Sequence, residues 1–243
     1  MYTFQSRVRY SELNHQKGCM DPSSIINYFQ DCSTFQSEDM NRGLAYLSAS
    51  HKVWMLNSWQ LQLLQPIRLG DEITVGTWPY DFKGFYGYRN FIMKNRQEEP
   101  LAVANSIWVY MDTLTRKPAR IPEDLNGYTI EPPYPMEHAD RKIEINCFCE
   151  PQAPLYVTKS NIDSYNHVNN GQYIKIAEQY LPDHFMIQSM RVEYRMQAVL
   201  DDCIIPKVVR EENRYLVILA SQDDKPYSVV EFVGYHMDET EGT

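Results

Sequence analysis

The chain has 243 residues, 43% of them hydrophobic and 23% charged, an ordinary composition for a globular protein with a substantial core. Its net charge of −9 argues against nucleic acid as the main partner, because no broad basic face is available. No apolar stretch approaches the roughly 18–20 residues that cross a bilayer. Residues 1–7 lack a basic region followed by an apolar core, so we expect no signal peptide and a cytoplasmic location.

The five cysteines are odd in number and scattered along the chain. Cys147 and Cys149 are too close together for a zinc knuckle, and no second pair of ligands completes one. In a reducing compartment such thiols are usually packing residues. We therefore expect no metal and no cofactor.

The first half of the chain predicts an extended run at residues 2–10, then one helix, then strands. Asp21 as the cap and Pro22 at the first helical position mark the start of the helix. Apolar residues recur at helical spacing after it, namely Ile25, Ile26, Phe29, Cys32 and Phe35. Alternating runs typical of strands follow at 54–65, 72–78, 84–93 and 101–111.

A proline-rich segment then interrupts any regular pattern. Proline removes a backbone donor and disfavours helix, so residues 117–137 are interpreted as a connector. The prediction is thus an N-terminal unit at 1–116, the connector, and a C-terminal unit at 138–243.

The second half repeats the order of the first. An extended run at 155–159 precedes a helix capped by Asn169 or Asn170, with Pro182 just beyond its end. Strand-like runs follow at 185–196, 203–209, 214–220 and 228–236, and a Leu-x-Asp-x-Ile pattern occurs at both 69–73 and 200–204. The repeat predicts an α+β protein made of two copies of one unit, each a long helix wrapped by an antiparallel sheet.

A polar run at residues 161–173 opens the second helix. It brings an acid, two amides and an imidazole to a helix N-terminus, where unpaired backbone N–H groups and the positive end of the dipole suit a developing negative charge. The alternative is that these residues are helix caps and the histidine is incidental. The candidate oxyanion donors are the backbone N–H groups of Val168, Asn169, Asn170 and Gly171.

The tandem units and the motif His167-Val-Asn-Asn-x-x-Tyr173 resemble the acyl-acyl carrier protein (acyl-ACP) thioesterases of bacteria and plant plastids. Residues 190–197 and the Leu-Gly-Asp-Glu run at 69–72 support the resemblance, which covers essentially the whole chain. It implies a tandem (double) hotdog fold. It also implies hydrolysis of fatty acyl thioesters on acyl carrier protein, with that carrier as the partner.

The family's active site combines an Asp, an Asn, a His and a Glu, followed in plant members by a Cys. Carried over to this chain, Asp163 and His167 are present, but Tyr165 occupies the Asn position. Gln197 occupies the Glu position and Ala198 the Cys position. Catalysis by a nucleophilic thiol at that position is therefore rejected.

The remaining residues still support general-base hydrolysis. His167 is the expected base, since an unperturbed imidazole titrates near neutrality. Asp163 would orient the imidazole, and Gln197 would position the attacking water. Asn166, next to the vacated Asn position, is a candidate replacement for the missing amide.

The acyl chain needs an apolar tunnel, for which the aromatic residues of the first half are candidates; each could equally be core. They are Trp54, Trp59, Trp78, Phe85, Tyr86 and Trp108. Basic residues that could dock the acidic carrier, or could simply be solvated, are Arg116, Lys117, Arg120, Arg141 and Lys142.

Two other functions remain open. The same site could hydrolyse acyl-CoA, or the protein could bind acyl groups without catalysis, as Tyr165 and Gln197 would allow. The tandem copy supplies what two hotdog subunits would, so both a monomer (a pseudo-dimer) and a homodimer are compatible with the sequence.

Overall fold

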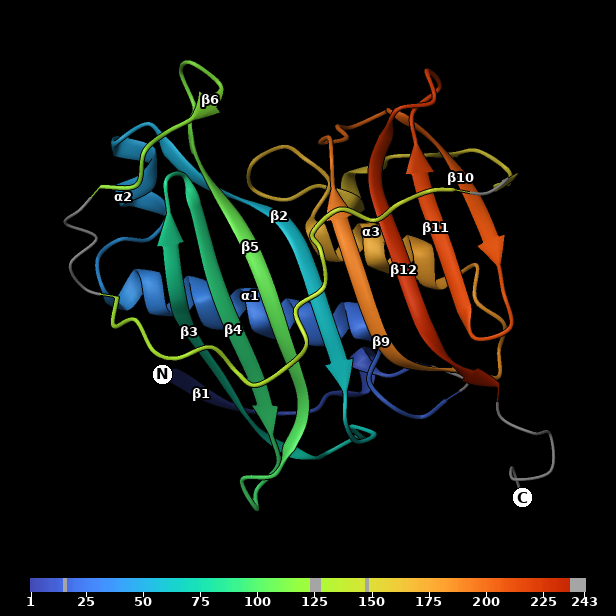
Figure 1. The fold of residues 1–243 in the computed structure, drawn as a ribbon, viewed down its shortest axis with the longest axis horizontal. Helices are drawn as coiled ribbons and strands as arrows, with labels where there is room; N and C mark the ends of the chain where they lie inside the picture. Colours follow the sequence, from blue (N-terminus) through green and yellow to red (C-terminus); the bar gives the residue numbers. More distant parts are fainter. Residues whose placement is uncertain (15–16, 123–127, 147–148, 237–243) are drawn as a thin grey trace.

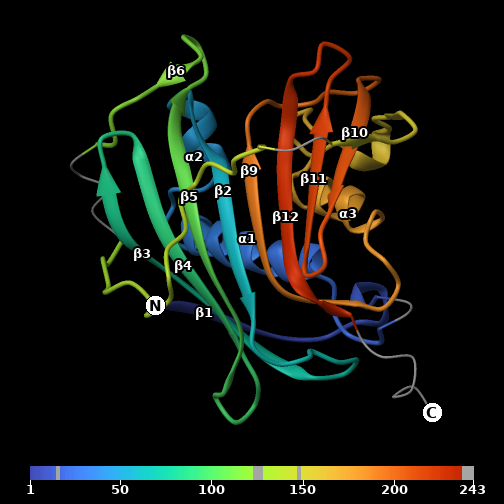
Figure 2. The same cartoon turned by 45° about the vertical axis from the view of Figure 1, so that its right-hand side comes forward.

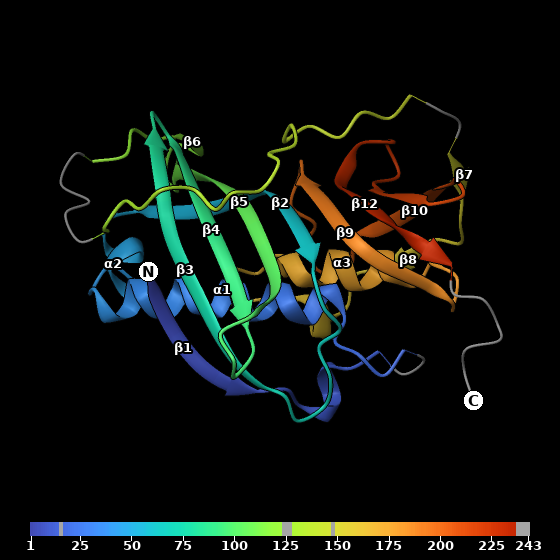
Figure 3. The ribbon, with the colours of Figure 1, turned by 60° about the horizontal axis from the view of Figure 1, so that its bottom comes forward.

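The computed structural model describes residues 1–14, 17–122, 128–146 and 149–236. Within them one 12-stranded sheet runs through the molecule in the order β1-β3-β4-β5-β2-β9-β12-β11-β10-β7, with β6 on β5 and β8 on β10. The two main helices, α1 and α3, lie on the same face of this sheet (Figures 1 and 3). This confirms the predicted tandem hotdog architecture.

The N-terminal half contains a long helix and the longest strands. Asp21 has an extended backbone and Pro22 opens the helix, as expected. Ile25, Ile26 and Phe29 are buried against the sheet, whereas Phe35 is 43% exposed at its edge. The elements are β1 (Tyr2–Arg7), η1 (Tyr10–Glu12), α1 (Pro22–Asp39), α2 (Leu44–Ala49), β2 (Lys52–Leu63), β3 (Glu72–Lys83), β4 (Tyr86–Lys94), β5 (Pro100–Asp112) and β6 (Lys117–Pro118).

The C-terminal half repeats this order with a much shorter helix. The expectation of a long second helix was wrong, because α3 has 9 residues, against 18 in α1. The elements are β7 (Glu150–Pro151), β8 (Leu155–Tyr156), η2 (Lys159–Asn161), α3 (Asn170–Glu178), β9 (Phe185–Tyr194), β10 (Cys203–Arg210), β11 (Arg214–Ala220) and β12 (Pro226–His236).

The two halves are joined by antiparallel pairing of β2 with β9 at the centre of the sheet (Figure 1). Trp59 pairs with Val192 and Leu61 with Met190, and all four side chains are buried in one common core. The predicted division at 1–116 and 138–243 therefore marks a repeat in the order of elements across one continuous core.

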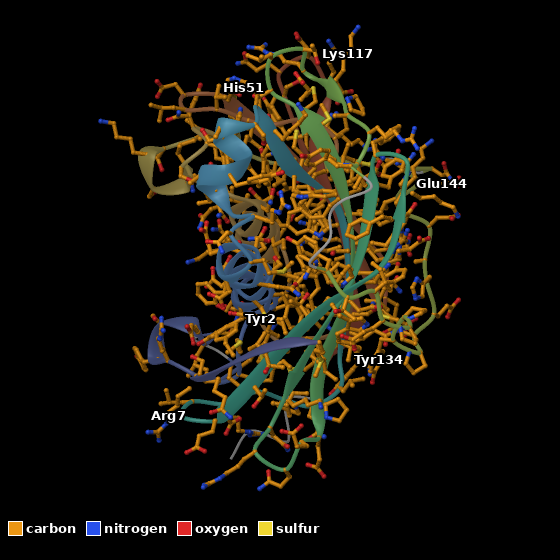
Figure 4. All side chains as sticks on the ribbon, turned by 90° about the vertical axis from the view of Figure 1, so that its left-hand side faces the viewer. Tyr2, Arg7, His51, Lys117, Tyr134 and Glu144 are labelled. Atoms are coloured by element: carbon orange, nitrogen blue, oxygen red, sulfur yellow. The ribbon has the colours of Figure 1, made fainter. Side chains whose placement is uncertain are left out.

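The segment after β6 crosses the face of the sheet opposite the helices (Figure 2). We call its described part, residues 128–146, the strap. Figure 4 shows Tyr134 and Glu144 on this outer side. Proline suits such a segment, because the strap forms no ladder that would need every N–H. It continues past residue 137, the predicted end of the connector.

Side chains of the sheet hold the strap in place. Gln60 on β2 donates to the carbonyl of Glu137 at 2.7 Å and accepts from the N–H of Ala139 at 3.0 Å. Asn90 accepts from the N–H of Tyr134 at 2.9 Å, and the Trp78 indole donates to the carbonyl of Pro132 at 3.0 Å. Polar groups on this face of the sheet are thereby satisfied.

Four cysteines of the described chain are free thiols, at positions 19, 32, 149 and 203, and Cys147 lies outside the described residues. No cluster of metal-binding side chains occurs in the part of the chain that the structure describes. Within that part, no helix has the length and apolarity needed to span a membrane.

A carboxylate of the second half caps the helix of the first half. The backbone N–H and the hydroxyl of Ser23 donate to the two oxygens of Glu178, at 3.0 and 2.9 Å. Asp21 accepts from Asn14 instead, and its side chain makes no cap hydrogen bond. Burial, and then the neighbouring Asp21, raise the pKa of Glu178 from 4.5 to about 8.

Replacing Glu178 should therefore change how stability depends on pH. In the folded state Glu178 holds its proton to higher pH than in the unfolded chain, so its contribution to stability falls as pH rises from about 4.5 through about 8. Glu178→Gln should flatten this fall in urea denaturation at a series of pH values. The exposed Glu212→Gln is the matched control. An unchanged pH profile in Glu178→Gln would contradict the assignment.

Candidate active site

A cavity of about 1070 Å³ lies between the two halves. One side is formed by α1, α2 and strands β2 to β5. The other is formed by residues 163–173 and 194–199, which include Asp163, His167 and Gln197. The structure thus brings the predicted reaction centre onto the wall of one large cavity.

The residues from Asp163 to His167 form a tight turn just before α3. The N–H of Asp163 donates to the carbonyl of His167 at 2.9 Å, and Ile162 and Val168 form a bridge beyond it. The Asp163 carboxylate accepts from the N–H of Tyr165 at 2.8 Å. Asn166 has a φ of 62°, a conformation that Asn tolerates better than most residues. The polar residues therefore shape the turn as well as the site.

His167 is partly buried on the cavity wall, and its Nδ1 is buried with no hydrogen-bond partner among the described residues. Asp163 makes no hydrogen bond to this imidazole, and one of its carboxylate oxygens accepts from the turn backbone. A buried polar atom without a partner on a cavity wall requires an explanation. A catalytic role of His167 is one such explanation.

Most of the predicted oxyanion donors are already used. The N–H of Val168 donates to Ala198, that of Asn169 to Asn161, and that of Gly171 to the Asn169 side chain, each at 2.9 Å. Gly171 also lies behind the wall, where an added Cβ would stand 2.5 Å from the Asn27 side chain. The N–H of Asn170, in the first turn of α3, is the remaining candidate.

Gln197 lies on an exposed segment that α3 holds in place. The N–H of the next residue, Ala198, donates to the hydroxyl of Tyr173 at 2.8 Å, while the hydroxyl of Tyr194 donates to the carbonyl of Asn170 at 3.0 Å. Gln197 lines the cavity, and its side chain makes no hydrogen bond to a described residue. It is therefore free to bind a water or a substrate group.

The two residues around the vacated Asn position differ in location. Tyr165 lines the cavity and is 44% exposed; burial, and then Asp163, raise its pKa. Asn166 is exposed and is not part of the wall. Its position outside the cavity wall gives no support to its suggested role as a replacement amide.

Of the predicted acyl-binding aromatics, only Trp54 and Trp108 line the cavity. Trp59 packs against Phe29 and Phe91 in the core, and Trp78 lies under the strap. Phe85 packs against Tyr86 at the β3–β4 turn, outside the cavity. Sequence could not separate these cases, because core and tunnel are both lined by aromatic residues.

Several wall residues carried no signal that sequence reasoning used. Leu47, Leu56, Phe82 and Met111 look like ordinary core. Along α1, polar residues recur at helical spacing and line the cavity, namely Gln30, Ser33, Thr34 and Ser37. In the sequence this stripe looks like a solvated face; Ser33 is in fact buried.

The basic residues proposed for docking fall in two places. Arg116 lines the cavity, and Lys117 and Arg120 are exposed close to it in sequence; Figure 4 shows Lys117 at the same end as His51. Arg141 stacks on Tyr86 from the strap, and Lys142 follows it, so both belong to the outer face. The two basic clusters therefore lie in different places, and docking by Arg141 and Lys142 stays a prediction.

The fold and the site define a double hotdog protein in which one cavity faces a polar turn at the start of the second helix. Sequence models of the acyl-ACP thioesterase family match most of the chain, the N-terminal domain over residues 1–128 and the C-terminal domain over 150–227. The chain belongs to the acyl-ACP thioesterase family.

Individual relatives are distant. The chain is 28% identical over 165 residues to the chloroplastic palmitoyl-acyl carrier protein thioesterase of Arabidopsis thaliana, covering 63% of this chain but 40% of that protein. An acyl-ACP thioesterase structure from Bacteroides thetaiotaomicron has a TM-score of 0.86 at 22% identity, over 96% of each chain. The 12:0-ACP thioesterase of Umbellularia californica has a TM-score of 0.82 at 17% identity, over 98% of each chain. These two structures share the fold.

Removing the Tyr173 hydroxyl should destabilise the protein. Tyr173→Phe leaves the buried N–H of Ala198 without its acceptor, which costs about 1–3 kcal/mol. The free energy of unfolding in urea measures the loss. Tyr180→Phe, beyond the end of the same helix and with no hydrogen bond from its hydroxyl to a described residue, should be near neutral. Equal effects of the two variants would rule out this role for Tyr173.

Proposed function

We propose that the protein hydrolyses fatty acyl thioesters of acyl carrier protein and releases the free fatty acid. One observation carries the proposal: His167, Asp163 and Gln197 share a single large cavity with apolar side chains of the first half. A thioesterase needs this combination, since the acyl chain must be buried while its carbonyl meets a base and a water. Membership of the acyl-ACP thioesterase family supports the same reaction.

The reaction needs a water, a base and a donor for the carbonyl oxygen. The imidazole of His167 accepts a proton as the water oxygen attacks the thioester carbon. The N–H of Asn170 stabilises the oxyanion with the help of the helix dipole. Collapse of the intermediate breaks the C–S bond, and the imidazolium returns the proton to the departing thiolate. Gln197 holds the water.

Asp163 fixes the turn that carries His167, because its carboxylate accepts from the N–H of Tyr165. The thiol position of plant members is filled by the buried Ala198. Cys203 is not on the cavity wall, so hydrolysis proceeds by direct attack of water.

Acyl carrier protein is acidic, so its docking requires a local positive patch. Arg116, at the cavity, with Lys117 and Arg120 close by, is the candidate patch. The phosphopantetheine arm would enter beside it and deliver the thioester to His167.

A second candidate function is acyl binding without turnover. The unformed hydrogen bond between Asp163 and His167, and Gln197 in place of a carboxylate, favour it. Hydrolysis of acyl-CoA by the same mechanism is a third candidate function. Assays with one acyl chain on both carriers separate these possibilities.

Loss of the imidazole should abolish most of the activity. His167→Ala should lower kcat on acyl-ACP by about 10²–10⁴-fold, the range for removal of a general base. The exposed His184→Ala, outside the cavity, is the matched control and should keep wild-type kcat. If His167→Ala kept full hydrolysis while Asp163→Ala abolished it, Asp163 and not His167 would be the base.

Restoring the family's amide should increase the rate. Tyr165→Asn puts a hydrogen-bonding group at the vacated position, and one additional hydrogen bond in the transition state corresponds to about a tenfold gain in kcat. Single-turnover hydrolysis on acyl-ACP and acyl-CoA measures it. No activity in either the wild type or Tyr165→Asn would support the binding role instead.

A further inference from the structure

The cavity contains a buried positive charge that the hydrolytic mechanism does not use. Arg89 on β4 is 8% exposed and lines the cavity. Its Nη1 donates to the side chains of Gln36 at 2.5 Å and Thr77 at 3.1 Å. Its guanidinium carbon lies 5.4 Å from the centre of the Tyr128 ring. The contacts of this guanidinium with the described residues are thus all to neutral groups.

No carboxylate of a described residue forms an ion pair with Arg89. Burial lowers its pKa to about 10, so the group is still a cation at neutral pH. A buried charge without a counter-charge is costly, and such groups are usually paired. The protein keeps this cation on the wall of its substrate cavity, where a ligand can supply the missing negative charge.

The unused donors of Arg89 form one edge of the guanidinium. Nε and Nη2 donate no hydrogen bond to a described residue. Neither atom is among the fully buried polar atoms without a partner, so both retain some exposed surface. They are therefore accessible from the cavity. This edge presents two parallel N–H groups, the geometry that binds a carboxylate through both oxygens.

The distance from the reaction centre fits the far end of an acyl chain. Gln30 on α1 accepts from the side chain of Asn170, beside the proposed oxyanion donor. Gln36, the partner of Arg89, lies six residues further along the same helix, about 9 Å at 1.5 Å per residue. Ser33 and Thr34, between them, also line the cavity. A chain that starts at His167 and follows this wall brings its end to Arg89.

We propose that Arg89 binds a carboxylate at the distal end of the acyl chain, so that the preferred substrates are medium-length thioesters of dicarboxylic acids. This deepens the proposed function and rests on it for the reaction, but the binding site itself does not depend on turnover. A methyl end would leave the guanidinium desolvated and unpaired. The apolar side chains of the cavity suit the length of such a chain, and Arg89 suits its charged end.

The test compares two acyl chains of equal carbon number on the same carrier protein, one ending in a methyl group and one in a carboxylate. The wild type should have at least about tenfold higher kcat/KM for the carboxylate-ended thioester, as a charged hydrogen-bonded pair provides. Arg89→Met should lose that preference, and Arg89→Lys should keep part of it. Arg96→Met, exposed at the end of β4, is the control and should leave the ratio unchanged.

Binding of non-hydrolysable analogues separates this inference from the proposed function. Amide analogues of the two acyl-pantetheines, measured by calorimetry, should bind the wild type with the same preference for the carboxylate. If the wild type prefers the carboxylate-ended analogue but hydrolyses neither thioester, the Arg89 site is supported and the proposed function is wrong. Equal or tighter binding of the methyl-ended analogue to the wild type would overturn the inference. This comparison uses the wild type alone, so it still decides the question if Arg89→Met fails to fold.

Discussion

The pairing of β2 with β9 is the constraint on which the rest of the structure depends. It joins two helix-and-sheet units into one sheet and places Trp59 and Leu61 in a common core with Met190 and Val192. Because both helices then lie on one face, the polar turn of the second unit meets the cavity of the first. The strap covers the other face, so the cavity side is left for substrate.

Backbone hydrogen bonding decides how the polar turn is used. A turn that must satisfy its own N–H groups takes the Asp163 carboxylate, the Asn169 side chain and the carbonyl of Ala198 for that purpose. What remains for chemistry is small: the imidazole of His167, the N–H of Asn170 and the exposed Gln197. The site is therefore defined by the few polar groups that the turn leaves without a partner, and not by the number of polar residues in it.

Sequence patterns predicted most of the fold because their causes are local. The alternating runs became strands, Asp21 and Pro22 began α1, and Asn169 capped α3. Asp163, His167 and Gln197 were expected at the site and line one cavity. Asn166 and Gly171 were expected there too, but neighbouring residues of a turn or helix point in different directions, which a one-dimensional motif does not resolve.

The sequence by itself determined the repeat, the family and the turn before the second helix, because hydrophobic period and turn residues act over a few positions. Only the tertiary structure decided which aromatics are core and which face substrate, since Trp59 and Trp108 differ in their neighbours and not in their residue type. It alone placed Arg89 on the cavity wall with no ion pair to a carboxylate of a described residue. The electrostatics of a buried charge depends on what lies around it in space, and the order of residues along the chain does not specify that.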